Sequence, residues 1–271
     1  MAELAKAAAY QPTEDAVTLA GRIRRRELTA RDALNAARDR IGSLNGALAA
    51  FCTLGADQAM AEAEAVDRQL DKGESVGPLA GVPVAIKDLI STRGLLTTFG
   101  SPLYRDNVPG EDDIVVERLR AAGAIIVGKT NTSEFGYGAV GHNNLFPTTR
   151  NPWNTALTPG GSSAGSAAAV ASGMVPIALG SDGGGSIRVP AGLTGTFGIK
   201  PSWGRVPVYP GCRDETQPGA SGWESLEHIG PITRTVADAA LTLSVLSGPT
   251  PRDRHSLPQE RLDWMDLAPD H

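Results

Sequence analysis

The stretch Gly160-Gly161-Ser162-Ser163-Ala164-Gly165-Ser166 is followed, after a short apolar run, by Gly183-Gly184-Gly185-Ser186. In the second cluster three glycines precede a serine, so successive backbone N–H groups can converge on one point and hold an anion. The oxyanion that develops during acyl transfer is an anion of this kind. The stretch therefore predicts a serine hydrolase site in which the nucleophile, Ser186, lies beside its own oxyanion hole.

The residues on either side of this stretch alternate between apolar runs and amphipathic segments. Strands are predicted at 82–88, 125–127, 177–180 and 195–200, and helices at 112–122, 165–172 and 236–246. Strand, helix and strand in succession indicate an α/β fold. Pro83 indicates that the first strand starts there or lies at an edge, because proline cannot donate to a β-ladder.

The beginning of the chain is predicted to be helical, with helices at 14–26, 31–41 and 56–70. Thr29 and Asp32 fit a capping box at the start of the second helix. We expect these helices to form an N-terminal layer within residues 1–75. The catalytic α/β part would occupy residues 76–271, and the whole chain, 1–271, would be one domain.

Composition and charge exclude several classes of protein. The net charge of −5 gives no reason to expect a nucleic-acid partner. No uncharged apolar run approaches the roughly 20 residues that span a bilayer, so we expect no membrane association. Cys52 and Cys212 are far apart, and the chain begins without an apolar leader, so we expect a cytoplasmic protein without a disulfide framework.

Two serines compete for the role of nucleophile. Ser163 is the centre of Gly161-Ser162-Ser163-Ala164-Gly165, which formally matches the G-x-S-x-G elbow of α/β-hydrolases. That elbow requires a buried strand directly before it, whereas residues 151–159 form a proline-containing loop. The apolar run 175–181 leads into Asp182 and the glycines before Ser186, so the context favours Ser186.

A serine nucleophile needs a base, and the four histidines, at 142, 228, 255 and 271, have no spacing that suggests one. Lys87 is the alternative, because it ends an apolar strand where a buried ammonium would be costly. To act near neutrality its pKa must fall from about 10.4 to about 7 or 8, and burial can lower it in this way. The simpler role for Lys87 is an ion pair with Asp88.

Three stretches resemble the amidase signature family: Val84-Ala85-Ile86-Lys87-Asp88, the cluster 160–166, and Ser181-Asp182-Gly183-Gly184-Gly185-Ser186-Ile187-Arg188. Ser186 follows Ser162 by 24 positions, which is the usual separation of the two catalytic serines in that family. Further matching stretches lie at 125–131, 151–153, 198–201 and 230–234. The resemblance therefore runs from about residue 13 to residue 250.

The resemblance implies the amidase signature fold, with a central mixed β-sheet flanked by α-helices. It also implies a Ser-cisSer-Lys triad that hydrolyses a small-molecule amide through a serine acyl-enzyme, without cofactor or metal. Ser186 would be the nucleophile, Ser162 the intermediate serine after a cis peptide bond, and Lys87 the base. The backbone N–H groups that would hold the oxyanion belong to Gly183, Gly184, Gly185 and Ser186.

Neighbouring polar residues have supporting roles that the sequence leaves open. Asp182 and Arg188 either orient the nucleophile loop through a charge-assisted hydrogen bond or lie in the substrate pocket. Ser163 and Ser166 precede an alanine-rich segment and could cap its helix, a role we expect of Ser166.

Two departures from the family pattern affect these expectations. Ala164 and Gly183 replace glycine and a threonine or isoleucine, and both remain small. Members of the family are normally much longer, so we expect that the usual C-terminal portion is lacking and that the chain is a fragment, a truncated product or half of a split enzyme. An unpaired sheet edge would then favour a homodimer or a complementary C-terminal chain.

Two other functions stay open. The glutaminase subunit of a tRNA-dependent amidotransferase uses the same triad, although Val189 stands where that subfamily usually carries glutamine. A catalytically silent scaffold, or a fragment that needs a partner chain, is the other. Nucleotide binding is excluded because the glycine clusters lack the Gly-Lys-Ser/Thr ending of a P-loop.

Overall fold

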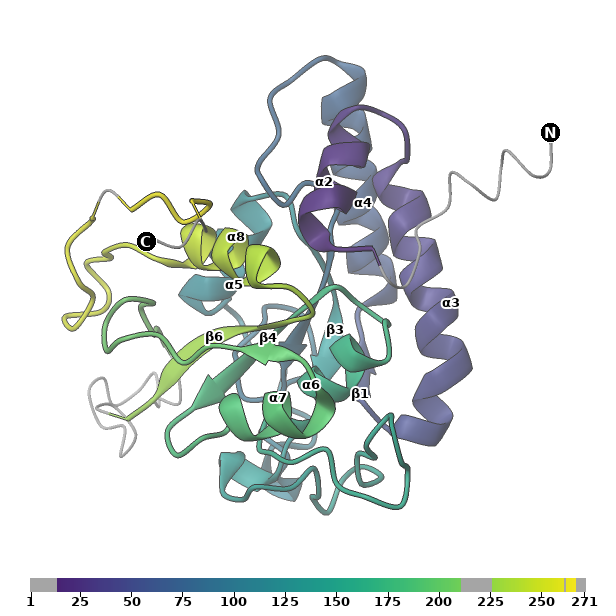
Figure 1. Ribbon diagram of the computed structural model, residues 1–271, viewed down its shortest axis with the longest axis vertical. Helices are drawn as coiled ribbons and strands as arrows, with labels where there is room; N and C mark the ends of the chain where they lie inside the picture. Colours follow the sequence, from purple (N-terminus) through teal and green to yellow (C-terminus); the bar gives the residue numbers. More distant parts are fainter. Residues whose placement is uncertain (1–13, 211–225, 261, 267–271) are drawn as a thin grey trace.

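The computed structural model describes residues 14–210, 226–260 and 262–266, and its centre is a six-stranded sheet (Figure 1). The strand order is β1-β3-β2-β4-β6-β5. The three central neighbours β3, β2 and β4 are parallel, and β1, β6 and β5 pair antiparallel with their neighbours. The predicted mixed sheet is therefore confirmed. The strands are β1 (Phe51–Leu54), β2 (Pro83–Lys87), β3 (Ile125–Thr130), β4 (Ile177–Asp182), β5 (Phe197–Gly198) and β6 (His228–Thr233).

Helices cover both faces of the sheet because the inner strands are apolar on both sides. Ala85 and Ala178 face one core, shared with α3, α4 and α6, whereas Val84, Ile86 and Leu179 face a second core, shared with α5 and α8. Strands buried on both faces are characteristic of parallel sheets. The helices are α3 (Ala30–Leu48), α4 (Ala56–Asp71), α5 (Ile114–Ala121), α6 (Ala164–Ala171), α7 (Arg188–Thr194) and α8 (Val236–Leu246).

The predicted N-terminal helices are present, and side-chain caps precede the first two of them. Asp15 caps α2 (Ala16–Arg24), and the Thr29 hydroxyl accepts from the N–H of Asp32 at the start of α3, as predicted. The helix α3 continues past the predicted end at residue 41 as far as Leu48, which is buried. Tertiary packing thus extends this helix beyond its sequence pattern.

Two strands were not predicted from the sequence. The strand β1 has only four residues and lies within the part that we expected to be helical. The strand β6 contains Gly230 and Pro231, which interrupt its apolar run, yet it pairs along its whole length with β4. Both strands form because they pair with a neighbouring strand, β3 for β1 and β4 for β6. The residues of a short segment do not show which strand it will pair with.

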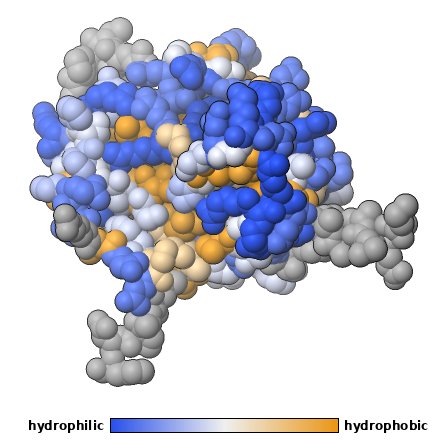
Figure 2. Space-filling model, turned by 90° about the horizontal axis from the view of Figure 1, so that it is seen from above, coloured by the Kyte–Doolittle hydropathy of each residue, from blue (hydrophilic) through white to orange (hydrophobic). Residues whose placement is uncertain are grey.

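The surface is mixed rather than uniformly polar. Figure 2 shows apolar residues gathered near the middle of one face, surrounded by hydrophilic side chains. Within the part of the chain that the structure describes, every helix is too short or too polar to cross a membrane.

Cys52 is half-buried with a free thiol, and Cys212 lies outside the described residues.

Candidate active site

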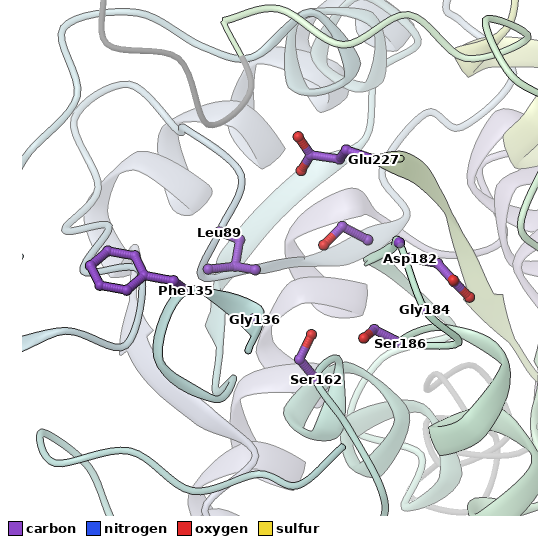
Figure 3. Close-up of a pocket in the computed structure, with 10 residues that line it drawn as sticks. Leu89, Phe135, Gly136, Ser162, Asp182, Gly184, Ser186 and Glu227 are labelled. Atoms are coloured by element: carbon purple, nitrogen blue, oxygen red, sulfur yellow. The ribbon is translucent and has the colours of Figure 1, made fainter. Parts of the chain in front are cut away.

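The predicted site residues meet at the carboxyl ends of the parallel strands β2 and β4. Lys87 is the last residue of β2, and Asp182 is the last residue of β4. Ligands of parallel sheets commonly bind beyond these strand ends. A pocket opens there (Figure 3), and the residues that line it are Leu89, Phe135, Gly136, Ser162, Ser181, Asp182, Gly183, Gly184, Ser186 and Glu227.

Lys87 is fully buried and points at Ser162. Its ammonium donates to the Ser162 hydroxyl at 2.6 Å and to the hydroxyl and the carbonyl oxygen of Ser181 at 3.0 and 3.3 Å. The carboxylate of Asp88 accepts from the N–H and the hydroxyl of Thr98. The structure thus brings Lys87 and Ser162 together as predicted, and adds Ser181 to their hydrogen-bond network.

Ser162 follows a cis peptide bond, as the resemblance implies. The backbone before it passes very close to another segment. A Cβ atom added to Gly161 would lie 2.5 Å from the backbone nitrogen and oxygen of Val140, so only glycine fits at this position. The absence of a side chain at residue 161 therefore allows the chain to place the Ser162 hydroxyl in the pocket.

Ser186 lies in the loop between β4 and α7 and is half-buried at the pocket wall. Figure 3 shows the hydroxyls of Ser162 and Ser186 both facing the pocket. Gly183 and Gly184 are exposed beside them. Two hydroxyls and exposed backbone at one point are the groups needed for nucleophilic attack on a carbonyl carbon.

The N–H of Gly185 is engaged within the nucleophile loop. It donates to the Asp182 carboxylate at 2.7 Å, in a backbone conformation with φ of 109° that favours glycine. To hold an oxyanion as predicted, this N–H would have to share or leave its bond to Asp182, so the role of Gly185 stays a prediction. The N–H groups of Gly183, Gly184 and Ser186 are predicted for the same role.

Asp182 organises the nucleophile loop. Its buried carboxylate accepts from the backbone N–H groups of Gly185, Ile187 and Arg188 and, at 3.0 Å each, from two nitrogens of the Arg188 guanidinium. Burial raises the pKa of Asp182, but the Arg188 side chain and the backbone N–H groups outweigh it and lower the pKa to about 2. Of the two roles that the sequence left open, the charge-assisted hydrogen bond is present, and Asp182 also lines the pocket.

Ser163 and Ser166 turn away from the pocket. The Ser163 hydroxyl bonds to the backbone of Ser181, and its backbone N–H donates to the carbonyl oxygen of Ser186 at 3.1 Å. This orientation contradicts the elbow alternative. Ser166 lies inside α6, and its hydroxyl donates to the carbonyl of Leu179, so the expectation that it caps the helix is wrong.

The structure describes His142, His228 and His255. His142 bonds to Thr148, and His228 lies within hydrogen-bond distance of the carbonyl oxygens of Leu226 and Asp182, at 2.8 and 3.3 Å. The described lining of the pocket contains no histidine, which agrees with the choice of lysine as the base. His271 lies outside the described residues.

Comparison with known proteins agrees with this geometry. The profile of the family described as Amidase matches residues 32–268. The chain belongs to the amidase signature family. A glutamyl-tRNA(Gln) amidotransferase subunit from Alkaliphilus metalliredigens is 45% identical over 239 residues, which are 88% of this chain and 47% of that protein.

Solved structures of amidase signature enzymes share the fold. A bacterial aryl acylamidase of the family superposes with a TM-score of 0.86 at 36% identity, over 93% of this chain and 51% of that one. A 6-aminohexanoate cyclic dimer hydrolase, complexed with substrate, superposes with a TM-score of 0.83 at 31% identity, over 95% of this chain and 51% of that one. The chain spans about half the length of these relatives.

Several pocket residues of this amidase signature chain were not predicted from the sequence. Ser181 ends an apolar run, where a serine resembles an ordinary strand terminus. Leu89 directly follows the Lys87 motif, and its position beside a predicted base could have identified it. Phe135 and Glu227 come from segments far along the chain, and no local pattern marks them.

Proposed function

We propose that the chain carries the catalytic centre of an amidase that cleaves a carboxylic amide C–N bond by acyl transfer. The observation that supports this most strongly is the 2.6 Å hydrogen bond between the buried Lys87 ammonium and the Ser162 hydroxyl, in a pocket that also contains Ser186. A buried amine, a bridging hydroxyl and a pocket-facing hydroxyl form a proton relay. Ser163 and Arg188 would support the nucleophile loop through their hydrogen bonds to Ser181, Ser186 and Asp182.

In the proposed reaction, neutral Lys87 accepts a proton from Ser162 while Ser162 takes the proton of Ser186. The Ser186 oxygen forms a bond to the amide carbon, and the carbonyl electrons move onto its oxygen. The N–H groups of Gly183, Gly184 and Ser186 stabilise that oxyanion, at about 3 kcal/mol for each donor. The C–N bond then breaks, and the amine leaves with the proton returned through Ser162.

Water completes the cycle. It attacks the ester carbon, loses its proton through Ser162 to Lys87, and releases the carboxylic acid and the Ser186 hydroxyl. Every step in this scheme uses side chains or backbone groups that line the pocket or touch a lining residue. The scheme therefore assigns no step to a cofactor or metal.

We further propose that the natural substrate is a small amide and that a partner chain, either a second copy or a complementary C-terminal chain, completes the pocket. The edge strand β5 has only two residues, and Val189 and Leu193 on α7 are exposed nearby. Exposed apolar side chains next to a sheet edge support such an interface. A cytoplasmic location stays a prediction from the sequence.

A second candidate function is the glutaminase subunit of a tRNA-dependent amidotransferase. The amidotransferase relative that is 45% identical over 239 residues favours it. The exposed Val189 after Arg188, where that subfamily usually carries glutamine, favours the amidase instead. Release of ammonia from glutamine, measured beside release from aryl and aliphatic amides, separates the two functions.

The deciding experiment is covalent labelling by a fluorophosphonate probe, followed by intact mass and peptide fragmentation. The hydroxyl oxygen of Ser186 would displace fluoride from phosphorus and gain the phosphonyl group. We expect labelling of the wild type, loss in Ser186→Ala and Lys87→Ala, and retention in the matched control Ser163→Ala. A folded wild-type chain that takes no label contradicts the proposal for this chain and favours the silent scaffold or the fragment that needs a partner chain. A label on Ser163 contradicts the proposal and favours the elbow.

A further inference from the structure

A second buried lysine, Lys129, lies in the sheet beside the strand that carries Lys87. Both side chains are fully buried. In the register of β2 and β3, Ile86 pairs with Lys129 and Lys87 pairs with Thr130. Because side chains alternate along a strand, Lys129 points to the opposite face of the sheet from Lys87. The proposed reaction therefore leaves Lys129 without a role.

The ammonium of Lys129 is enclosed by the loop that follows β2. It donates to the carbonyl oxygen of Ile90 and to the hydroxyls of Thr92 and Thr97, at 2.9 and 3.0 Å for the hydroxyls. Thr92 donates its own hydrogen to Ile90, and Thr97 donates to Leu95. Three acceptors thus face one nitrogen, and only a protonated lysine has three donors to match them.

Acidic groups surround this ammonium on several elements. Burial lowers the pKa of Lys129 to about 8, and Asp88, Cys52, Asp113 and Asp112 act in the opposite direction. Burial likewise raises the pKa of Asp88, which Lys129 lowers. The lysine and Asp88 each favour the charged form of the other, as in a buried ion pair.

A chain of hydrogen bonds connects this loop to the pocket. The Asp88 carboxylate accepts from Thr98, and the Asp88 carbonyl accepts from the N–H of Phe99. The Phe99 carbonyl then accepts from the N–H of Phe135 at 2.8 Å. The next residue, Gly136, is so near the site that a Cβ atom added there would lie 3.3 Å from the Ser162 hydroxyl oxygen.

The same loop contributes directly to the site. It begins after Lys87, and its second residue, Leu89, lines the pocket. The N–H of Ile90 also donates to the Lys87 carbonyl oxygen at 3.0 Å. A displacement of the segment 88–98 would therefore move the backbone of the proposed base and the pocket wall together.

We propose that Lys129 is a positioning residue whose ammonium holds the segment 88–98 in the conformation that places Lys87 against Ser162 and Leu89 in the pocket wall. The catalytic part of this assignment rests on the proposed function. The structural part, which is that Lys129 keeps the segment 88–98 ordered, is independent of the proposed function. An experiment with one measurement for each part distinguishes their failures.

The variants are Lys129→Met, which keeps the length of the side chain and removes its donors, and the pair Thr97→Val and Thr97→Ser. Hydrogen exchange of residues 88–101 and the rate of phosphonylation at Ser186 are measured on the full chain. We expect Lys129→Met to raise exchange and to slow labelling at least tenfold. Thr97→Val should change both measurements at least threefold, whereas Thr97→Ser, which keeps the hydroxyl, should stay within twofold of the wild type.

The pH profile provides a readout that a purely structural role would not change. Above a pH of about 8 the neutral amine leaves one acceptor unmatched, so the wild-type labelling rate should decline there. Thr97→Val should shift this decline to lower pH. The variant removes one of the three acceptors of the Lys129 ammonium, which lowers the pKa of Lys129 further. Lys72→Met, at an exposed lysine, is the matched control and should leave the profile unchanged.

Unchanged exchange and unchanged labelling in Lys129→Met and Thr97→Val would overturn the proposal. If Lys129→Met does not fold, the comparison of Thr97→Val with Thr97→Ser decides by the same measurements. If the folded wild type takes no label, the proposed function fails, and exchange alone then judges whether Lys129 orders the segment. Increased exchange with wild-type labelling in both variants would overturn the catalytic part.

Discussion

The ammonium nitrogen of Lys87 lies 2.6 Å from the hydroxyl oxygen of Ser162, although 75 residues separate them in sequence. The contact joins the end of β2 to the turn that begins α6. It forms at the edge of the sheet where the loop after β4 also begins, because the parallel neighbours β2 and β4 have their carboxyl ends at the same edge. This contact links the base to the pocket in the proposed relay.

Replacement of Lys87 by methionine should abolish the relay while the chain still folds. Methionine fills a similar volume and removes the cost of burying a polar amine, so we expect the thermal midpoint to change little. Labelling and amide hydrolysis should fall by about 100-fold or more, which is the usual contribution of a general base. Lys200→Met, at a half-buried lysine outside the pocket, is the control, and equal losses in both variants would contradict the prediction.

Asp182 should make the stability of the fold depend on pH in the acid range. Its pKa falls from 3.8 to about 2 on folding, so the folded state binds its proton less readily than the unfolded state does. The stabilisation is complete above the unfolded value and is lost as the pH falls from about 4 towards 2. Because half of the Arg188 side chain is exposed, we expect on the order of 1 kcal/mol.

Urea unfolding of the wild type and of Asp182→Asn between pH 3 and pH 7 measures this contribution. The difference between the two free energies of unfolding should shrink as the pH is lowered, since the asparagine does not titrate. A difference that stays constant with pH would contradict the assignment. Arg188→Lys should reduce the wild-type slope, because lysine cannot form the two parallel hydrogen bonds.

Gly161→Ala should disrupt the site through the backbone. The added methyl group would lie 2.5 Å from backbone atoms of Val140, which cannot move aside as a flexible side chain could. We expect loss of labelling at Ser186 and a lower unfolding midpoint, measured by mass spectrometry and thermal denaturation. A variant that labels at the wild-type rate would show that the two segments can separate without effect on Ser162.

Gly42→Ala should have the opposite effect on stability. Gly42 lies within α3, is exposed, and offers open space to an added Cβ atom. Alanine in place of glycine in a helix interior stabilises by about 0.5–1 kcal/mol. Urea unfolding should show this gain with unchanged labelling, and a loss of stability would contradict the helical assignment at this position.

The central strands could be predicted because their residues carry the evidence within a few positions. Residues 125–127 are β-branched and follow a glycine that ends a helix, and residues 83–87 are apolar throughout except for the last. The strand β6 could not be predicted in this way, since Pro231 argues locally against a strand. Its pairing with β4 supplies the hydrogen bonds that stabilise it.

The site shows the same division. Ser162, Ser186 and Lys87 stand in motifs that can be recognised from the sequence, and the structure brings Lys87 to Ser162 and places both serines at one pocket. The hydrogen bond from the Gly185 N–H to Asp182 could not be predicted, because the direction of an N–H group depends on the backbone dihedrals and on the nearest acceptor. That acceptor, Asp182, is only three residues away in sequence, but the backbone conformation of the turn determines whether the N–H of Gly185 points at it.

The sequence by itself determined which chemical groups this chain contains, the order of its main helices and strands, and its family. Periodicity, turn residues and motifs are local properties, and they persist whatever the rest of the chain does. The tertiary structure alone decided which groups touch. A hydrogen bond requires contact within about 3 Å, and for residues as distant as Lys87 and Ser162 that contact depends on strand pairing and on the close packing of Gly161 against Val140.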